Sequence, residues 1–342
     1  MQAFIKAIDY YLPAKTLTSA DLAAEYPDWT IEKIEGKTGI AQRHIAGPDE
    51  CSSDLGVAAA KKLFESGACQ PQDVDFLLLC TQSPDYFLPT TACLMQDRLG
   101  IPTAAGALDF NLGCSGYIYG LGMAKGLIET GQARRVLLVT AETYSKFLNR
   151  GDKSVRTIFG DAAAATLVEG KEQGDAGDAA LTGPFVYGTD GQGGENLIVP
   201  VGGLRRARTS RDAEPVTDES GNVRTPENLY MNGPEIFNFT LRIVPKLVQD
   251  LLERSKSTVE TIDLFVFHQA NQYMLDHLRK RMKVPAEKFF IHMRDCGNTV
   301  SSTIPIALKH AAAEGRLKKG DRVMLVGFGV GYSWGATLIQ WN

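Results

Sequence analysis

The chain has 342 residues, of which 44% are hydrophobic and 22% charged, and its formal net charge is −4. This composition is typical of a folded globular protein with one large domain or two packed halves. Nucleic-acid binding is not expected, because it usually needs a concentrated basic surface. The apolar runs are shorter than the roughly 20 residues of a membrane-spanning helix, and no secretion signal precedes them. We therefore expect a cytoplasmic protein without a membrane span.

Short apolar, β-branched runs alternate with helical stretches along the chain. Strands are predicted from Gln2 onward and then over 74–80, 107–112, 135–140, 262–267, 322–326 and 336–341. Helices are predicted over 54–66, 91–99, 116–131, 235–255, 271–282 and 303–315. Continuous apolar strands that alternate with helices indicate an α/β fold whose sheets are covered on both faces.

The second half of the chain repeats the pattern of the first. The segments around Asp75, Pro102 and Val136 reappear in the same order, at nearly one spacing, around Asp263, Pro285 and Val323. Such a repeat indicates an internal duplication. We predict a first half over residues 1–180, which carries Cys114, and a second half over 181–342. The region from about 188 to 230 has no counterpart in the first half, and we predict an inserted surface loop there.

Cys114 is predicted to stand at a strand-to-helix turn between two glycines. None of the six cysteines forms a Cys-x-x-Cys pair, so neither a zinc site nor a disulfide framework is expected. The default for any one of them is a buried, small apolar residue. A cysteine at a helix N-terminus differs, because the helix dipole and the free amides there favour the thiolate.

Two polar residues of the second half are expected to join Cys114. Asn298 follows Pro285 much as Cys114 follows Pro102, and His268 follows an apolar strand. Strand ends of two pseudo-symmetric halves meet where ligands usually bind. A cysteine can attack a thioester, while histidine and asparagine can donate hydrogen bonds to a carbonyl oxygen that becomes an enolate. Cysteine proteases use the same residue types, but their Cys-Gly-Ser-Cys-Trp run is absent.

A glycine-rich turn over 326–336 contains Gly329, Val330 and Gly331. Its spacing allows a phosphate-binding loop, but such loops open a helix, and this turn precedes a strand. A backbone amide that faces Cys114 is the better interpretation.

Together these motifs resemble the β-ketoacyl-acyl-carrier-protein synthase III family of the thiolase superfamily. The likeness covers essentially the whole chain and rests on the runs 37–44, 114–117, 158–162, 231–237, 268–271, 297–299 and 332–336. It implies a five-layer αβαβα fold and a homodimer that works with acyl carrier protein. It also implies that no metal or redox cofactor is needed.

The resemblance further implies a two-step reaction. Cys114 would take an acyl group from a thioester primer. His268 and Asn298 would then bind a malonyl thioester and support its decarboxylation, and the enolate would attack the acyl-cysteine. The amide of Cys114 and one from the Gly329–Gly331 turn would form the oxyanion hole. The product would be a β-ketoacyl thioester for fatty-acid or specialised acyl or polyketide biosynthesis.

The coenzyme A entrance departs from the pattern of the housekeeping enzymes. Their tryptophan and first arginine align with Lys33 and Lys37, and two later arginines align with Lys153 and Tyr273. Trp29 lies nearby but out of register. Lysine offers only a point charge where arginine makes bidentate phosphate contacts. We therefore predict a specialised enzyme that prefers an acyl group on a carrier protein.

Other positions bear on the acyl chain and its carrier. The phenylalanine that limits the acyl pocket across the dimer interface is Leu88 here, which predicts a differently shaped and longer pocket. Phe159 and Asn232 are further substrate-binding candidates from the matching runs. The arginine-rich run 205–211 could dock an acidic carrier protein, or it could simply be a solvated loop.

Two alternatives remain beside condensation. Some relatives transfer the acyl group from cysteine to a hydroxyl or amine without decarboxylation, but they often lack the histidine or asparagine. An inert partner subunit of an active paralogue is the second alternative, and the intact set of Cys114, His268 and Asn298 disfavours it.

Overall fold

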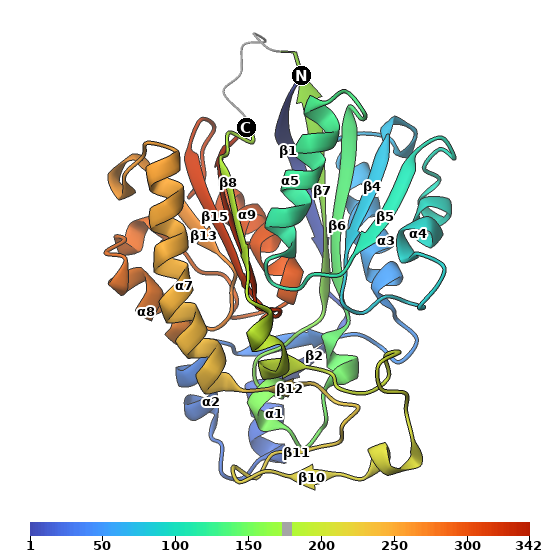
Figure 1. The fold of residues 1–342 in the computed structure, drawn as a ribbon, viewed down its shortest axis with the longest axis vertical. Coiled ribbons are helices and arrows are strands. Elements are labelled where there is room, and N and C mark those ends of the chain that lie inside the picture. Colours follow the sequence, from blue (N-terminus) through green and yellow to red (C-terminus); the bar gives the residue numbers. More distant parts are fainter. Residues whose placement is uncertain (173–179) are drawn as a thin grey trace.

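The computed structural model describes residues 1–172 and 180–342, and two five-stranded sheets form its framework (Figure 1). The first sheet has the order β1 (Gln2–Tyr11), β7 (Ala162–Lys171), β6 (Arg135–Glu142), β4 (Phe76–Cys80) and β5 (Gly106–Phe110). The second has the order β8 (Phe185–Thr189), β16 (Ser333–Gln340), β15 (Arg322–Gly329), β13 (Leu264–Phe267) and β14 (Phe289–Phe290). In both sheets the last three strands are parallel and the first two join antiparallel. This equal order agrees with the predicted duplication.

Helices form three layers around these sheets. The central layer is α5 (Gly116–Glu129) with α9 (Thr303–Ala313). Their apolar side chains share one core with both sheets, as Leu121, Leu308, Leu138 and Leu325 illustrate. The outer layers are α3 (Ser52–Glu65) with α4 (Thr91–Leu99), and α7 (Gly233–Arg254) with α8 (Gln272–Arg281). The result is the predicted five-layer αβαβα fold, and the six predicted helices are confirmed to within a few residues.

Small residues bring α5 close to the first sheet. A Cβ atom on Gly116 would lie 2.2 Å from the sulfur of Cys80, and one on Gly120 would lie 2.5 Å from Leu138 Cδ1. Only glycine therefore allows α5 to approach β4 and β6 this closely. This approach fixes the start of α5, and with it Cys114, against the strand ends.

Two long connections form a cap at one end of the sheets (Figure 1). Residues 12–51 contain β2 (Lys15–Thr18), α1 (Ser19–Glu25), α2 (Ile31–Thr38) and β3 (Gln42–Ile45). Residues 190–232 contain β9 (Leu197–Ile198), β10 (Val216–Thr217), β11 (Val223–Arg224) and β12 (Tyr230–Met231). Each connection joins an edge strand to the first outer helix of its half. The first half thus has a connection of different sequence at the place that 190–232 occupies in the second half, and the predicted insertion over 188–230 stays a prediction.

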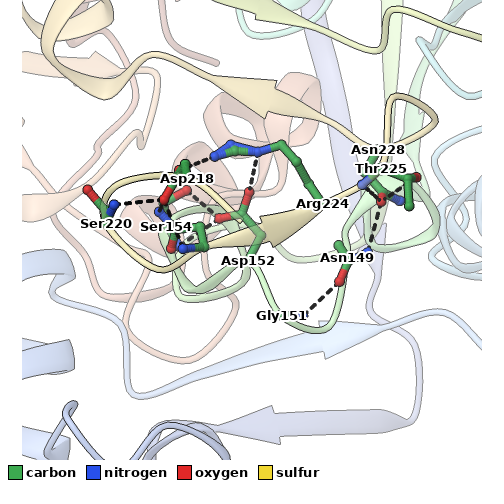
Figure 2. Close-up of polar contacts among 10 residues, drawn as sticks. Asn149, Gly151, Asp152, Ser154, Asp218, Ser220, Arg224, Thr225 and Asn228 are labelled. Atoms are coloured by element: carbon green, nitrogen blue, oxygen red, sulfur yellow. Dashed lines mark hydrogen bonds and ion pairs between the residues drawn. The ribbon is translucent and has the colours of Figure 1, made fainter. Parts of the chain in front are cut away.

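The second connection is pinned to α6 (Lys153–Arg156) by a polar network rather than lying free (Figure 2). The guanidinium of Arg224 lies 3.4 Å from the carboxylate of Asp152 and also pairs with Asp218. Asp152 is fully buried and caps α6 by accepting from the amide of Ser154 at 3.0 Å. The connection is thus held against the segment that leads to the site.

In the part of the chain that the structure describes, every helix is too short or too polar to cross a bilayer. The predicted division of the halves at residue 180 adjoins residues 173–179, which lie outside the described residues, and it stays a prediction.

Candidate functional site

Cys114, His268 and Asn298 line one cavity of about 170 Å³. Cys114 lies two residues before α5, His268 directly follows β13, and Asn298 lies shortly before α9. The ends of strands and the starts of central helices from both halves thus meet at this cavity. All three side chains are at least 94% buried, so their hydrogen bonds decide their chemistry.

His268 is neutral and held through one ring nitrogen. Its Nδ1 lies 2.8 Å from the hydroxyl oxygen of Thr303, which itself donates to the carbonyl of Val300 at 3.0 Å. Nδ1 must therefore be the protonated nitrogen, and Nε2 carries the free lone pair. Burial lowers the pKa of His268 to about 3, opposed by a hydrogen bond to the backbone of Val300. The resting ring is thus an acceptor at Nε2, whereas the sequence predicted a donor.

Asn298 presents its amide nitrogen to the cavity. Its side-chain oxygen accepts from the amide of Val300 at 2.9 Å, which is the turn chemistry expected for asparagine. Its Nδ2 donates to the carbonyl of Ala270 at 3.3 Å and lies 3.5 Å from Nε2 of His268. The side-chain amide of Asn298 is therefore a hydrogen-bond donor that lies beside Nε2 of His268.

The thiol of Cys114 is not the thiolate that its place near a helix start predicted. Burial, followed by the nearby carboxyl of Glu142, raises the pKa of Cys114 to about 12. The backbone amides of Cys114 and Val330 act in the opposite direction, because both are directed at the sulfur. Desolvation outweighs them, so the resting group is a thiol that needs a proton acceptor before it can attack.

Glu142 and Val300 support the site, and the sequence did not indicate either. Glu142 is fully buried behind Cys114 and accepts hydrogen bonds from Ser83 at 3.2 Å and Ser301 at 3.0 Å. Burial raises the pKa of its carboxyl to about 8. Val300 has a φ of 55°, a left-handed conformation that is unfavourable for a β-branched residue. This strain places its amide and carbonyl where Asn298 and His268 use them.

The other predicted site residues divide into two groups. Gly329, Phe159 and Tyr273 line the Cys114 cavity. Val330 lines a neighbouring cavity, and its backbone amide is directed at the sulfur of Cys114. Gly331 lines neither of these two cavities.

The remaining four residues do not line this cavity. The side chain of Asn232 caps α7 by accepting from Glu235 at 3.3 Å. Lys37 and Lys153 lie on α2 and α6, and neither lines the cavity. Leu88 is 82% exposed on the surface.

Two further cavities follow that of Cys114 and share lining residues in series as far as Phe87. The adjoining cavity of about 280 Å³ is lined by Val330 and shares Leu197 with the first. A third, of about 740 Å³, shares Val199 with the second and reaches Phe87. Part of the second is polar, because the hydroxyl of Tyr144 donates to the amide oxygen of Gln82 at 2.5 Å.

One group of possible metal ligands occurs among the described residues, and it lies outside the Cys114 cavity. Ligand atoms of His292, His310 and Glu314 are within 4.8 Å of one another. The two imidazole rings are stacked, with centroids 3.6 Å apart and planes at 18°. The lone pairs of stacked rings lie in two separate and nearly parallel planes, so they do not converge on one ion. This arrangement therefore gives no support for a metal centre.

The buried, neutral His268 predicts loss of stability in acid. The unfolded chain protonates this residue near pH 6.5, whereas the folded protein does so only near pH 3. Between these values the unfolded state binds more protons, so the free energy of unfolding falls as pH is lowered. Urea unfolding measures the free energy of unfolding at pH 7.5 and at pH 5. Between these two pH values it should fall by about 2 kcal/mol more in the native protein than in His268→Gln. Equal losses in the two proteins would contradict this account.

Comparison with known proteins places this site in a family. The family model described as 3-oxoacyl-[acyl-carrier-protein] synthase III matches residues 108–191, and the model of its C-terminal region matches 252–341. A β-ketoacyl-[acyl-carrier-protein] synthase III of Caldanaerobacter subterraneus is 38% identical over 332 residues, which cover 97% of this chain and 96% of the relative. The chain belongs to the β-ketoacyl-acyl-carrier-protein synthase III family. This confirms the resemblance inferred from the sequence.

Solved structures of synthase III proteins agree with the assignment. A crystal structure of a 3-oxoacyl-(acyl-carrier-protein) synthase III is 55% identical, covers 100% of both chains and has a TM-score of 0.97. The priming β-ketosynthase of the R1128 polyketide pathway is 29% identical, with a TM-score of 0.84, and covers 100% of this chain and 97% of its own. Synthase III proteins are condensing enzymes of the acyltransferase class. Membership thus favours condensation over the two alternatives drawn from the sequence.

Proposed function

We propose that this protein loads an acyl group on Cys114 and condenses it with a malonyl thioester to give a β-ketoacyl thioester. The observation that carries the proposal is the meeting of Cys114, His268 and Asn298 in one cavity. The amides of Cys114 and Val330 support an oxyanion hole, because both are directed at the reacting sulfur. These roles need neither a metal nor a redox cofactor.

The hydrogen bonds of His268 suggest how protons move. We infer that Nε2 accepts the proton of Cys114 as the sulfur attacks the primer, and that the departing carrier thiolate is protonated by solvent. The malonyl carboxylate then supplies a negative charge that stabilises the buried imidazolium. The protonated Nε2 and the Nδ2 of Asn298 donate to the malonyl thioester carbonyl while carbon dioxide leaves.

The second step completes the cycle without any other reactant. The enolate carbon bonds to the acyl carbon, and the oxygen of the tetrahedral intermediate lies in the oxyanion hole. The bond from the acyl carbon to the sulfur of Cys114 breaks, and the thiolate takes the proton back from His268. The whole cycle consumes one proton from solvent, which ends on the thiol of the departed primer carrier.

We propose that the primer arrives on acyl carrier protein rather than on coenzyme A. The ring of Trp29 is contacted by the ammonium groups of Lys33 at 5.2 Å and Lys37 at 5.1 Å, which leaves its face unsuited to stacking on an adenine. The docking role predicted for the arginine-rich run is weakened, because Arg206 pairs with Asp212 and Arg208 with Glu227. In the described residues, Arg205 and Arg211 form no ion pair and would contribute most.

We also propose that the cavities between Cys114 and Phe87 hold the acyl chain. The protein would be a homodimer in which a second copy covers the cavity that reaches Phe87. Tyr86, Phe87 and Leu88 are 62%, 80% and 82% exposed, an unusual exposure for three consecutive apolar residues. Tyr86 and Phe87 line the third cavity, and β5 is an edge strand of the first sheet. We expect a cytoplasmic location, since Cys114 must remain reduced to accept an acyl group.

Mass spectrometry tests both the reaction and the carrier. The native protein should form an acyl adduct on Cys114 with acyl carrier protein as donor. With malonyl carrier protein it should release carbon dioxide and a product two carbons longer. Loading from acetyl-coenzyme A should be slower by at least about tenfold, because the entrance lacks bidentate phosphate contacts. Acyl transfer without carbon dioxide would contradict the reaction, and equal loading from both donors would contradict only the carrier preference.

A further inference from the structure

Arg43, in β3, is a fully buried arginine without an acidic partner. Its side chain is 0% exposed, and no ion pair in the described part of the chain includes it. Nearby carboxylates are engaged elsewhere, since Glu25 pairs with Arg156 and Glu35 with Arg294. Burial lowers the pKa of Arg43 only to about 10, so the group stays charged at neutral pH. An unpaired buried cation destabilises a fold, so its presence calls for another explanation.

The guanidinium of Arg43 joins two segments of backbone. Its Nη1 donates to the carbonyl of Leu17 at 3.1 Å, and its Nη2 donates to the carbonyl of Thr157 at 2.8 Å, while Nε has no partner. Leu17 belongs to β2, and Thr157 ends α6. The planar fork of arginine fixes the spacing of two acceptors in a way that no apolar side chain can.

The aliphatic part of the Arg43 side chain packs against two neighbouring backbone segments, one with Phe159 and the other with Asn298. A Cβ atom placed on Gly160 or on Gly297 would lie 3.0 Å from the Cβ of Arg43, so both glycines pack directly against it. These two segments are hydrogen-bonded to each other, because the amide of Gly160 donates to the carbonyl of Asn298 at 3.0 Å. The amide of Asn298 donates in turn to the carbonyl of Ile158 at 3.0 Å. The backbone of Asn298 is therefore fixed by a segment that Arg43 holds at Thr157.

We propose that Arg43 is a positioning residue for Asn298, and that it acts on the malonyl half-reaction but not on the loading of Cys114. The proposal rests on the proposed function. Cys114 is positioned by α5 and by the turn at Val330, and the hydrogen bonds of Arg43 go instead to Leu17 and Thr157. The backbone of Asn298 depends on the segment that Arg43 holds, because its neighbour Gly297 packs on Arg43 and its own amide donates to the carbonyl of Ile158, next to Thr157.

The test compares the two half-reactions in Arg43→Met, Arg43→Lys and the native protein. Loading is measured as the rate of acyl-adduct formation on Cys114, and the second step as carbon dioxide release from malonyl carrier protein by preloaded enzyme. In Arg43→Met the second rate should fall by roughly 10- to 100-fold while loading stays near the native rate. Arg43→Lys keeps the charge and can reach one carbonyl, so it should recover part of the second rate.

Arg156→Met is the matched control, because it removes a neighbouring, largely buried arginine that pairs with Glu25. It should lower the melting temperature without changing the ratio of the two rates. An unchanged ratio in folded Arg43→Met, or in Arg43→Lys if the first variant does not fold, would overturn the proposal. A parallel fall of both rates would also overturn it. A native protein that neither loads nor condenses would instead refute the proposed function.

Discussion

Replacing Cys114 by alanine is expected to abolish the acyl adduct and to lower condensation by at least about 10³-fold. In the proposed reaction the sulfur bonds the acyl group, and among the described residues no other thiol lines the cavity. Decarboxylation of the malonyl thioester should persist, because His268 and Asn298 remain in place. Intact-protein mass spectrometry and carbon dioxide release measure the two outcomes.

Cys296→Ala is the control for this change. Cys296 is also buried, and burial raises its pKa to about 12, but it does not line the Cys114 cavity. This variant should still load an acyl group. Persistence of an adduct in Cys114→Ala would show that another residue accepts the acyl group, and it would refute the proposed role.

Gly329→Ala is expected to slow the loading of Cys114 by roughly 100-fold, although only one methyl group is added. The new Cβ would lie 2.9 Å from both Cβ and Sγ of Cys114, which is closer than nonbonded carbon and sulfur atoms approach. The thiol must therefore shift away from the amide of Val330. The rate of adduct formation on Cys114 measures the effect.

Gly126→Ala is the matched substitution in the same protein. Gly126 lies inside α5, and a Cβ atom there would meet no atom within 4 Å. This change should leave loading intact and stabilise the helix by up to about 1 kcal/mol. A Gly329→Ala enzyme as active as Gly126→Ala would mean that the turn around Val330 can move freely.

The sequence predicted the framework well because the fold depends on repeated apolar patterns. The runs around Leu78 and Val266 are continuous and buried, so both strands were recognisable without tertiary information. The duplication then placed Cys114 and Asn298 at matching helix starts. The connection 12–51 was not recognised as an equivalent of 190–232, because the two share a position in the fold but no pattern.

The chemistry of the site was less accessible to sequence reasoning. A helix start predicts a thiolate at Cys114, but the pKa depends on burial and on Glu142, which is far along the chain and is brought near only by folding. The protonated nitrogen of His268 likewise depends on Thr303, which is 35 residues away along the chain. Arg43 would pass for an ordinary surface charge, since burial of an arginine without an acid is rare and leaves no local signal.

The cap has a consequence for how such enzymes diversify. Leu197 and Val199, which line the cavity next to that of Cys114, come from the connection 190–232, whereas Cys114 and His268 stand at the ends of the sheets. The connection is held to the rest of the protein at particular points, such as the pair of Arg224 with Asp152. Mutations can therefore accumulate in the cap and alter which acyl chains fit, while the reacting groups stay under separate selection. A lineage could acquire new substrates in this way without rebuilding its chemistry.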